Sequence, residues 1–167
     1  SARSLSSQKL TNRNCLMLIR RNDPRDFRAF AELNLAWIKE LHHVEPSDQA
    51  MHDHPEPYAQ DGNCIFAVIE EGKVSGVCAL KQDDDGDWEL TKMAVDPDFQ
   101  GQGIGKVLMD AVEDFAKKEL GLQRIYLLTN TVNAAAIRLY KRCGWSVTFE
   151  GTHPRYARAN IGLEKYL

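Results

Sequence analysis

The sequence predicts a mixed α/β fold in which a mainly antiparallel sheet is flanked by helices. Two apolar runs at residues 63–69 and 73–80 flank a short connection that ends in glycine, which is typical of a β-hairpin. A third run at residues 88–95 continues the meander and leads into a glycine-rich loop. An amphipathic helix pattern follows the loop, and the next apolar run lies at residues 124–129. Strand, helix and strand in this order form a βαβ unit with parallel strands.

Composition limits the classes of protein to which the chain can belong. It has 167 residues, of which 43% are apolar and 27% charged, as in an ordinary globular domain. The formal net charge of −3 offers no electrostatic attraction to nucleic acid or to an anionic membrane. No apolar run approaches the roughly 18 residues that a membrane span needs. We therefore expect a cytoplasmic protein without nucleic-acid or membrane partners.

The polar start of the chain lacks the apolar core of a signal peptide. We interpret residues 1–13 as a disordered leader or an expression remnant, and residues 14–167 as one domain. The cysteines show no CxxC spacing and stand beside apolar residues, so we expect buried reduced thiols. They are Cys15, Cys64, Cys78 and Cys143.

The first part of the domain reads as a strand and a helix. Residues 15–19 form a short apolar run, and Asp23-Pro24 is a typical helix start. The helix is expected to extend to about residue 43. Its inner stripe contains one polar member, Asn34, which is either a capped or solvated side chain or one that faces a pocket. The stripe comprises Phe27, Phe30, Asn34, Trp37, Ile38 and Leu41.

Residues 42–57 are polar, broken by prolines, and rich in histidine and acidic residues. A short helix is expected to start at Ser47. The segment allows three readings: a solvated loop, a wall of a substrate pocket, or a metal site. No HExxH spacing is present and no cysteine lies nearby, so we expect no metal.

The end of the chain supplies the remaining elements. Asp83 to Gly86 is expected to be an exposed hairpin tip, and Gly121 terminates the central helix. Residues 133–142 read as a second helix and 145–150 as a strand. A final strand is expected within residues 156–167.

The glycine-rich loop, residues 100–105, is the strongest local signal for a ligand. Its sequence is Gln-Gly-Gln-Gly-Ile-Gly, and it lies where the backbone N–H groups at the start of a helix have no intrahelical partner. Gly101, Gly103 and Gly105 carry no Cβ, so a bulky anion could approach those N–H groups, favoured by the helix dipole. The loop lacks the Gly-Lys-Ser/Thr ending of a Walker loop and differs from the dinucleotide fingerprint. The pattern predicts a pyrophosphate site.

Two motifs resemble those of the GNAT superfamily of N-acetyltransferases. The loop reads as Gln-x-x-Gly-x-Gly after a strand that ends Met-Ala-Val-x-Pro, which is similar to the acetyl-coenzyme A loop of that family. Further on, Asn133, Ala136, Leu139-Tyr140 and Gly144-Trp145 match the spacing of a second GNAT motif, with tryptophan in place of phenylalanine. Asn133 and Tyr140 are two helical turns apart and therefore share a helix face.

The resemblance implies a GNAT fold whose sheet splays between the strand before and the strand after the loop helix. It implies acetyl-coenzyme A as cosubstrate and direct acetyl transfer to a primary amine of a small molecule, peptide or protein. The first helix and the histidine-rich segment resemble small acetyltransferases that are also found fused to MarR-type regulators. The residues expected at the cofactor are Met93, Ala94, Val95, Gln100, Gly101, Gln102, Gly103, Ile104, Gly105, Lys106, Asn133, Ala136 and Tyr140.

Two residues are expected to move protons. Tyr140 matches the family's general acid, and a phenol with a pKa near ~10 is close to a thiol leaving group. Glu89 stands where the histone-acetylating branch of the family carries a base, and an ammonium substrate must lose a proton before it attacks. Asp87 and Glu45 are the fallback candidates for the base.

The sequence says less about the residues that bind the acceptor. Asn34 and Glu45 are expected to contact the substrate, and the acidic balance of residues 45–61 and 83–89 suits a cationic amine. A polyamine, aminoglycoside, lysine side chain or peptide N-terminus would fit, and an amino acid is not excluded. The protein is expected to be a monomer or homodimer. Two other readings are an acyl-coenzyme A sensor without catalysis and an interaction module with a purely structural loop.

Overall fold

The computed structural model describes residues 8–12, 15–156 and 158–167. The strands are β1 Gln8–Asn12, β2 Cys15–Arg21, β3 Cys64–Glu70, β4 Lys73–Gln82, β5 Trp88–Val95, β6 Arg124–Thr129, β7 Ser146–Glu150 and β8 Ile161–Tyr166. The α-helices are α1 Phe27–Leu41, α2 Pro46–Asp53, α3 Ile104–Lys118 and α4 Ala134–Arg142. Three 3-10 turns are η1 Pro24–Asp26, η2 Glu56–Ala59 and η3 Pro97–Phe99.

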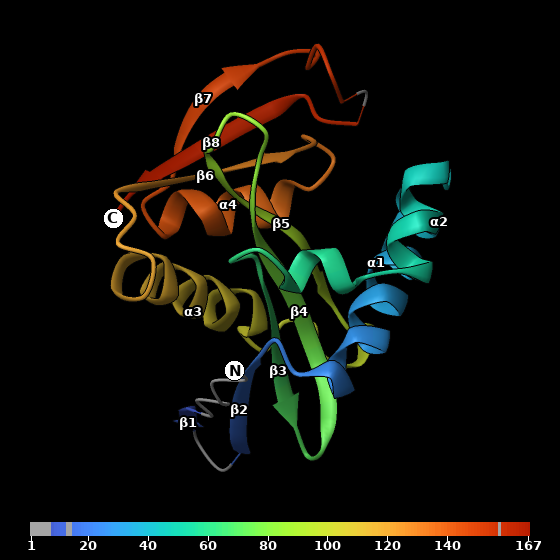
Figure 1. Ribbon diagram of the computed structural model, residues 1–167, viewed down its shortest axis with the longest axis vertical. Coiled ribbons are helices and arrows are strands. Elements are labelled where there is room, and N and C mark those ends of the chain that lie inside the picture. Colours follow the sequence, from blue (N-terminus) through green and yellow to red (C-terminus); the bar gives the residue numbers. More distant parts are fainter. Residues whose placement is uncertain (1–7, 13–14, 157) are drawn as a thin grey trace.

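The described strands form one sheet of eight, in the order β1-β2-β3-β4-β5-β6-β8-β7 (Figure 1). Every neighbouring pair is antiparallel except β5 and β6, which are parallel and flank α3. The predicted mixed α/β fold with its βαβ unit is therefore confirmed.

The structure places part of the expected leader in the sheet. Residues 8–12, assigned to a disordered leader, form β1 and pair with β2 from Gln8↔Ile19 to Asn12↔Cys15. A short edge strand is held by main-chain hydrogen bonds to its neighbour and needs no apolar pattern of its own. Hydrophobic periodicity therefore could not find it. Residues 1–7 and 13 of the expected leader lie outside the described residues.

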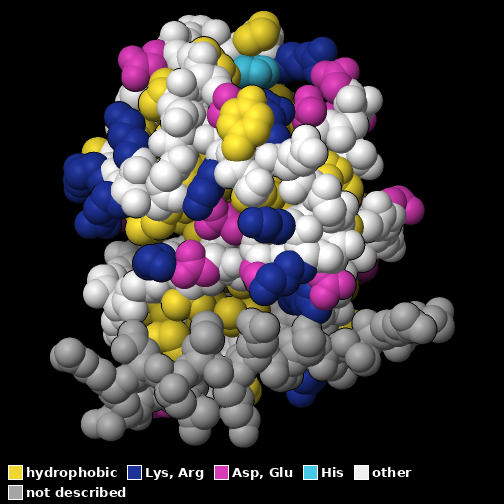
Figure 2. Space-filling view, turned by 90° about the vertical axis from the view of Figure 1, so that its left-hand side faces the viewer, with side chains coloured by type: hydrophobic (Ala, Val, Ile, Leu, Met, Phe, Trp, Pro, Cys, Tyr) yellow, Lys and Arg dark blue, Asp and Glu magenta, His cyan; other side chains and the backbone are white. Residues whose placement is uncertain are grey.

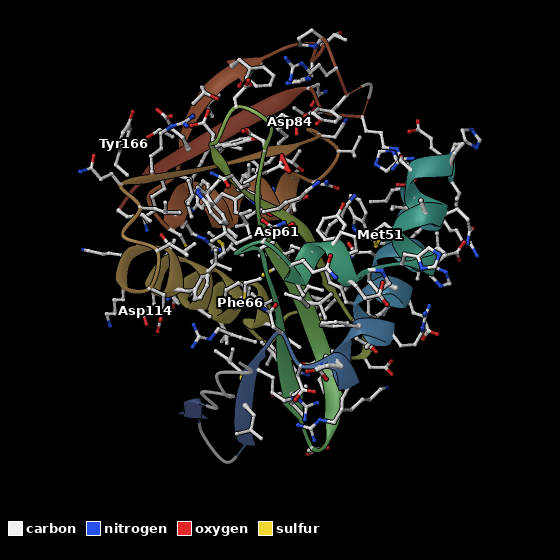
Figure 3. The ribbon with its side chains drawn as sticks, viewed as in Figure 1. Met51, Asp61, Phe66, Asp84, Asp114 and Tyr166 are labelled. Carbon is white, nitrogen blue, oxygen red and sulfur yellow. The ribbon has the colours of Figure 1, made fainter. Side chains whose placement is uncertain are left out.

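The sheet has two apolar faces, and β3 supplies both because all its residues are buried. Cys64, Phe66 and Val68 belong to a cluster with the inner residues of α3, whereas Ile65, Ala67 and Ile69 pack with residues of α1 and α2. We call these the α3 face and the α1 face. Figure 1 shows the helix pairs on opposite sides of β3 and β4, and Phe66 and Met51 in Figure 3 mark the two clusters.

The first helix differs in detail from its prediction. Asp23 caps the 3-10 turn η1, accepting the Arg25 N–H at 3.0 Å, and the α-helix proper begins only at Phe27. Hydrogen bonds from the Arg25 side chain lower the pKa of Asp23 to about 2. The helix ends at Leu41 with His42 as its C-cap.

The surface carries mixed charge. On the face shown in Figure 2, basic and acidic side chains lie interspersed, as the small net charge of −3 leads one to expect. None of the helices in the described part of the chain is both long enough and apolar enough to cross a bilayer.

Candidate active site

The glycine loop has the geometry of an anion site at the start of α3. Gly101 and Gly103 adopt left-handed φ values of 76° and 79°, and a Cβ on either would meet no atom within 4 Å. The first bond into the helix runs from the Val107 N–H to the Gly103 carbonyl, at 3.1 Å. The N–H groups that precede it are free to bind an anion at the positive end of the helix dipole.

The third glycine serves packing. Gly105 is helical, and a Cβ there would lie 3.1 Å from Leu139 Cδ2 and 3.9 Å from Met93 Sδ. Its lack of a side chain therefore lets α3 approach α4 and β5. This packing role accompanies the anion-binding role that the sequence predicts for Gly105. Gly76, which the sequence analysis did not single out, does the same for β4, because a Cβ there would lie 2.5 Å from Ile104 Cγ2.

A β-bulge interrupts β5 just before the loop. Leu90 packs on the α3 face and Ala94 on the α1 face, although residues four apart in a regular strand share a face. The register explains this, since Thr91 pairs with Ala79 and Ala94 with Val77, which leaves two residues of β5 opposite one of β4. The extra residue is Lys92, whose φ is 58°.

Asn34 secures the bulge from the α1 side. Its side-chain amide donates to the main-chain carbonyl of Lys92 at 3.0 Å and to that of Phe30 at 2.9 Å. The residue is only 2% exposed. A polar side chain in the apolar stripe of α1 is thus explained by the carbonyl that the bulge leaves without a strand partner.

Beyond the bulge the sheet splays. Strands β5 and β6 share one register pair, Glu89↔Tyr126, and then separate. Residues Met93, Ala94 and Val95 therefore keep main-chain groups that no strand on the β6 side occupies. This is the split that the GNAT resemblance implies.

Tyr140 of α4 lies at this opening on the α3 face. Its hydroxyl is 4.0 Å from Met93 Sδ, and its ring lies 6.1 Å from that of Trp145. Burial raises the pKa of Tyr140 to about 12, with Cys78 adding to the effect. The phenol is therefore protonated at neutral pH. Among the described residues, its hydroxyl contacts a thioether, which is a weak acceptor, so the proton is available.

The start of α4 lies on the same side of the opening as Tyr140. Asn133 donates from its side chain to Thr129 Oγ1 at 3.0 Å, and its carbonyl accepts the Ile137 N–H at 3.0 Å. Ala136 packs against the cluster of the α3 face. Asn133 thus links the end of β6 to the first turn of α4. At the loop, Lys106 is exposed and pairs with Asp110 at 2.7 Å.

Glu89 lies on the opposite face of β5. Its neighbour Leu90 points to the α3 face, so Glu89 points to the α1 face, between its strand partners Lys81 and Tyr126. Burial raises the pKa of Glu89, while the charge of Lys92 acts against that rise. A carboxyl group with a raised pKa is a stronger base than an exposed one.

Two tyrosines line the surroundings of Glu89. Tyr126 donates from its hydroxyl to Asp83 Oδ2 at 2.6 Å. Tyr58 of η2 has Lys81 Nζ 5.2 Å above its ring. Burial raises the pKa of Tyr58 to about 12, and the charge of Glu89 contributes next. The segment after α2 therefore reaches the neighbourhood of Glu89.

An ion pair joins α2 to the segment between β7 and β8. Arg158 Nη1 donates to Asp48 Oδ1 at 2.9 Å, and its Nη2 also bonds Asp48 Oδ2 and, at 2.7 Å, the His43 carbonyl. Asp48 is only 3% exposed. Hydrogen bonding to Arg158 lowers the pKa of Asp48. We call this contact the Asp48–Arg158 clasp.

Glu45 lies beside the clasp as the N-cap of α2. Its side chain and that of Asp48 form a capping box, so the helix begins at Pro46, one residue before the expected start. Glu45 Oε2 is 3.7 Å from Arg158 Nη2, and the side chain is 54% exposed. An open hollow of about 440 Å³ is lined by Glu40, Leu41, His42, His43, Glu45 and Arg158. It lies at the end of α1, away from the glycine loop.

The histidine-rich segment is partly helical. His52 Nδ1 is 3.4 Å from Asp53 Oδ1, and Arg28 Nη1 donates to the His52 carbonyl at 3.0 Å. Within the described ranges, no three His, Cys, Asp or Glu side chains gather as around a metal ion.

Residues 28–145 match the family model described as the acetyltransferase (GNAT) family. The chain belongs to the GNAT acetyltransferase family. It is similar to a mycothiol acetyltransferase of Propionibacterium freudenreichii, with 33% identity over 64% of this chain and 36% of that protein. It is also similar to an N-acetylaspartate synthetase of Xenopus tropicalis, with 37% identity over 52% of this chain and 32% of that protein. The chain thus spans about a third of the length of these relatives.

Solved structures share the fold. A GNAT acetyltransferase from Staphylococcus aureus Mu50 superposes with a TM-score of 0.77 at 23% identity, over 90% of this chain and 99% of that one. A putative acetyltransferase from Salmonella typhimurium, solved with its cofactor acetyl-CoA, gives 0.71 at 23% identity, over 90% and 94%. The ribosomal-protein-S18-alanine N-acetyltransferase of Escherichia coli gives 0.68 at 22% identity, over 90% and 93%.

In this GNAT domain the structure brings together most of the expected residues. The glycine loop, the end of β5 and Tyr140 meet around the splay, and Glu89 lies on the other face of the same strand. Asp87 is in the hairpin before β5, 3.6 Å from Arg124. The fallback bases Asp87 and Glu45 are therefore both near arginine side chains.

Sequence reasoning missed Lys92, although a signal for it was present. Trp88 and Leu90 are apolar at even positions, whereas Met93 and Val95 are apolar at odd positions. Such a change of parity within one strand indicates an inserted residue, which is a bulge. Arg158 was missed as well, because no periodic pattern or motif surrounds it.

Proposed function

We propose that this protein transfers the acetyl group of acetyl-coenzyme A directly to a primary amine of a small molecule, peptide or protein. The observation that carries the proposal is the splay of β5 from β6, with the open glycine loop at one end of β5 and a protonated tyrosine at its side. Relatives named mycothiol acetyltransferase and N-acetylaspartate synthetase, and structural neighbours named spermidine N-acetyltransferase, support it.

The residues present fit the cofactor. Around Gly101 and Gly103 no protein atom occupies the place of a side chain, so a pyrophosphate can reach the main-chain N–H groups from residue 101 to Lys106. The unpaired edge of Met93, Ala94 and Val95 suits the amides of a pantetheine arm, with Asn133 and Ala136 across the opening. Bound there, acetyl-coenzyme A supplies an acetyl group activated as a thioester.

Tyr140 is the proposed general acid. It holds its proton at Oη and gives it to the sulfur that leaves. Because burial raises its pKa to about 12, the proton transfer is less favourable than with an ordinary phenol. The same burial raises the pKa of a thiol, so the two groups stay closer in pKa than the shift of Tyr140 alone suggests.

Glu89 is the proposed general base, directly or through water. The amine arrives as an ammonium, and Glu89 accepts one proton from it before the nitrogen attacks the carbonyl carbon. As the N–C bond forms and the C–S bond breaks, the nitrogen loses a second proton and the sulfur gains one. Transfer to an ammonium thus releases one proton overall.

Asn34 is proposed to act through the bulge. Its amide holds the Lys92 carbonyl, so it positions β5 between the acid and the base without needing to touch the acceptor. Glu45 stays a proposed acceptor contact, since it is exposed at the start of α2.

The direct test combines binding and turnover. Purified protein is titrated with coenzyme A in a calorimeter, and thiol release from acetyl-coenzyme A is measured with a pool of primary amines. Binding together with amine-dependent release supports the transferase. Binding with no release in any pool would instead assign an acyl-coenzyme A sensor, and absence of binding would leave the loop a structural feature.

A further inference from the structure

Three charged side chains lie together on the α1 face beside the splay. Lys81 of β4 and Glu89 of β5 are cross-strand partners. Lys92 follows Glu89 on the same strand, at the bulge. Burial raises the pKa of Glu89, and the charges of Lys92 and Lys81 both lower it, so all three groups are within electrostatic reach.

Three of the carboxylates that suggested a cationic acceptor make contacts within the protein. Asp48 is buried in the clasp with Arg158, and Glu45 lies 3.7 Å from the same guanidinium. Asp83 accepts the hydroxyl of Tyr126. Arg158 therefore offsets part of the negative charge of this segment, whereas Asp83 keeps its charge.

Within the described part of the chain, the side chains of Lys81, Glu89 and Lys92 have no direct partner of opposite sign. Among the described residues, no ion pair within 4.0 Å includes Lys81, Glu89 or Lys92. Burial lowers the pKa of Lys92, whereas Asp48 and Glu89 raise it. A partly buried ammonium without a bonded partner is stabilised when an anionic ligand binds it.

Candidate acceptors differ in how they meet this arrangement. A polyamine would place a second ammonium near Lys92 and Lys81, where like charges repel. An amine with no other charged group would, once protonated, pair with Glu89 and leave Lys81 and Lys92 without an anionic partner. An amine with a carboxylate on the same carbon would satisfy Glu89 with its ammonium and Lys92 with its carboxylate.

We infer that the acceptor is a zwitterion of the α-amino acid class, with its carboxylate bound by Lys92 and its amine directed to Glu89. This inference rests on the proposed function, since it names the substrate of the same site. The bulge is what makes it possible. Without the extra residue, position 92 would share the α3 face with Leu90, and its charge would point away from Glu89.

The experiment compares matched acceptors. Thiol release is measured with each of the twenty amino acids, with the α-carboxamides of those that react, and with spermidine. We expect at least one amino acid to exceed its own carboxamide in kcat/KM by roughly 10- to 100-fold, as loss of one charge-assisted hydrogen bond predicts. Equal or better turnover of the carboxamides or of spermidine would overturn the inference.

Variants assign the effect to Lys92. Lys92→Gln should raise KM for the amino acid by roughly 10-fold or more and leave that of the carboxamide nearly unchanged, and Lys92→Arg should restore much of the preference. Lys118→Gln, a lysine 71% exposed at the far end of α3, is the matched control. An equal loss with both acceptors in Lys92→Gln would contradict carboxylate binding.

Failure of the acceptor assignment and failure of the proposed function give different results. If amines without a carboxylate are acetylated best, only the acceptor assignment fails and the transferase stands. If coenzyme A binds but neither these acceptors nor any pool of primary amines, peptides included, releases thiol, the proposed function fails, and the acceptor assignment fails with it.

Discussion

The side-chain amide of Asn34 donates a 3.0 Å hydrogen bond to the main-chain carbonyl of Lys92, 58 residues further along the chain. This bond joins the middle of α1 to the one irregular point of β5. The irregularity brings the carbonyl of Lys92 to Asn34 of α1 and returns Met93 to the α3 face, beside Tyr140. A single local distortion thus sets the positions of residues on both sides of the proposed reaction site.

Asn34→Leu should destabilise the protein and slow turnover. The substitution leaves the Lys92 carbonyl without its donor in a site that is 2% exposed, which costs about 1–3 kcal/mol of unfolding free energy. Urea denaturation measures the first effect and thiol release the second. The matched control is Gln49→Ala, since Gln49 is exposed and its side chain donates to Asp53 on the same helix. Wild-type turnover in a folded Asn34→Leu protein would separate the bulge from catalysis.

Gly103→Glu should weaken coenzyme A binding by at least ~100-fold, or about 2.7 kcal/mol. The new side chain occupies the open space before α3 and brings a negative charge to an anion site. Strain at the left-handed φ of 79° is a separate effect. Gly86→Glu controls for it, because Gly86 has a φ of 88° at the exposed tip of the β4–β5 hairpin. Calorimetric titration with coenzyme A decides, and unchanged affinity would place the cofactor elsewhere.

The parts of the site that are local in sequence could be predicted, and the parts that depend on distant contacts could not. The glycine loop and Tyr140 follow from turn chemistry and helical spacing within one motif each. Lys92 is an intermediate case. The apolar positions of β5 change from even to odd numbers within its eight residues, but the role of the inserted residue is clear only once the two faces of the sheet are known. The Asp48–Arg158 clasp joins residues 110 apart, and nothing near either residue indicates the other.

The same distinction applies to the acidic residues. A count of carboxylates in residues 45–61 indicates negative charge, but it cannot tell which carboxylates the fold neutralises. Asp48 is neutralised by Arg158 from the opposite end of the chain. Charge balance at a site is therefore a property of tertiary contacts, and the proposed zwitterionic acceptor depends on contacts that the sequence does not show.

Tyr140→Phe should lower turnover by roughly 10²- to 10³-fold with little change in coenzyme A affinity. The ring remains in its place against Trp145, and only the proton donor is lost. Pre-steady-state thiol release measures the chemical step, and a thermal melt checks the fold. Full turnover at neutral pH would leave Tyr140 as a packing residue.

Glu89 should produce the acidic limb of the pH profile of kcat/KM. The base must be ionised, so activity falls as the pH drops through its pKa, which burial raises above the ordinary value of 4.5. Lys92, Thr91 and Lys81 lower this pKa, and Asp83 raises it. Removing the charge of Lys92 should therefore move the limb to higher pH, and Glu89→Gln should abolish it. A limb that does not move in Lys92→Gln would contradict the coupling of the two groups.

Asp48→Asn should destabilise the protein by about 1–3 kcal/mol, because Arg158 loses its hydrogen-bonded carboxylate but keeps Glu45 at 3.7 Å and partial contact with water. The sign of the pH dependence follows from the lowered pKa of Asp48. The clasp contributes its full stability above the pKa of the unfolded carboxyl group, and the contribution is lost as the pH falls through the folded pKa. Urea midpoints measured across that range should converge for wild type and variant at low pH. A constant difference at all pH values would exclude the clasp as its source.

Glu45→Gln provides the comparison on the same helix. Glu45 is 54% exposed, so its loss should change stability far less than that of Asp48. If Glu45 also contacts the acceptor, KM for the acceptor should rise while KM for acetyl-coenzyme A stays constant. Asp53→Asn, an exposed acid at the end of α2, is the control for a change of charge alone. An acceptor KM that is the same in all three proteins would remove Glu45 from the acceptor site and leave it as the cap of α2.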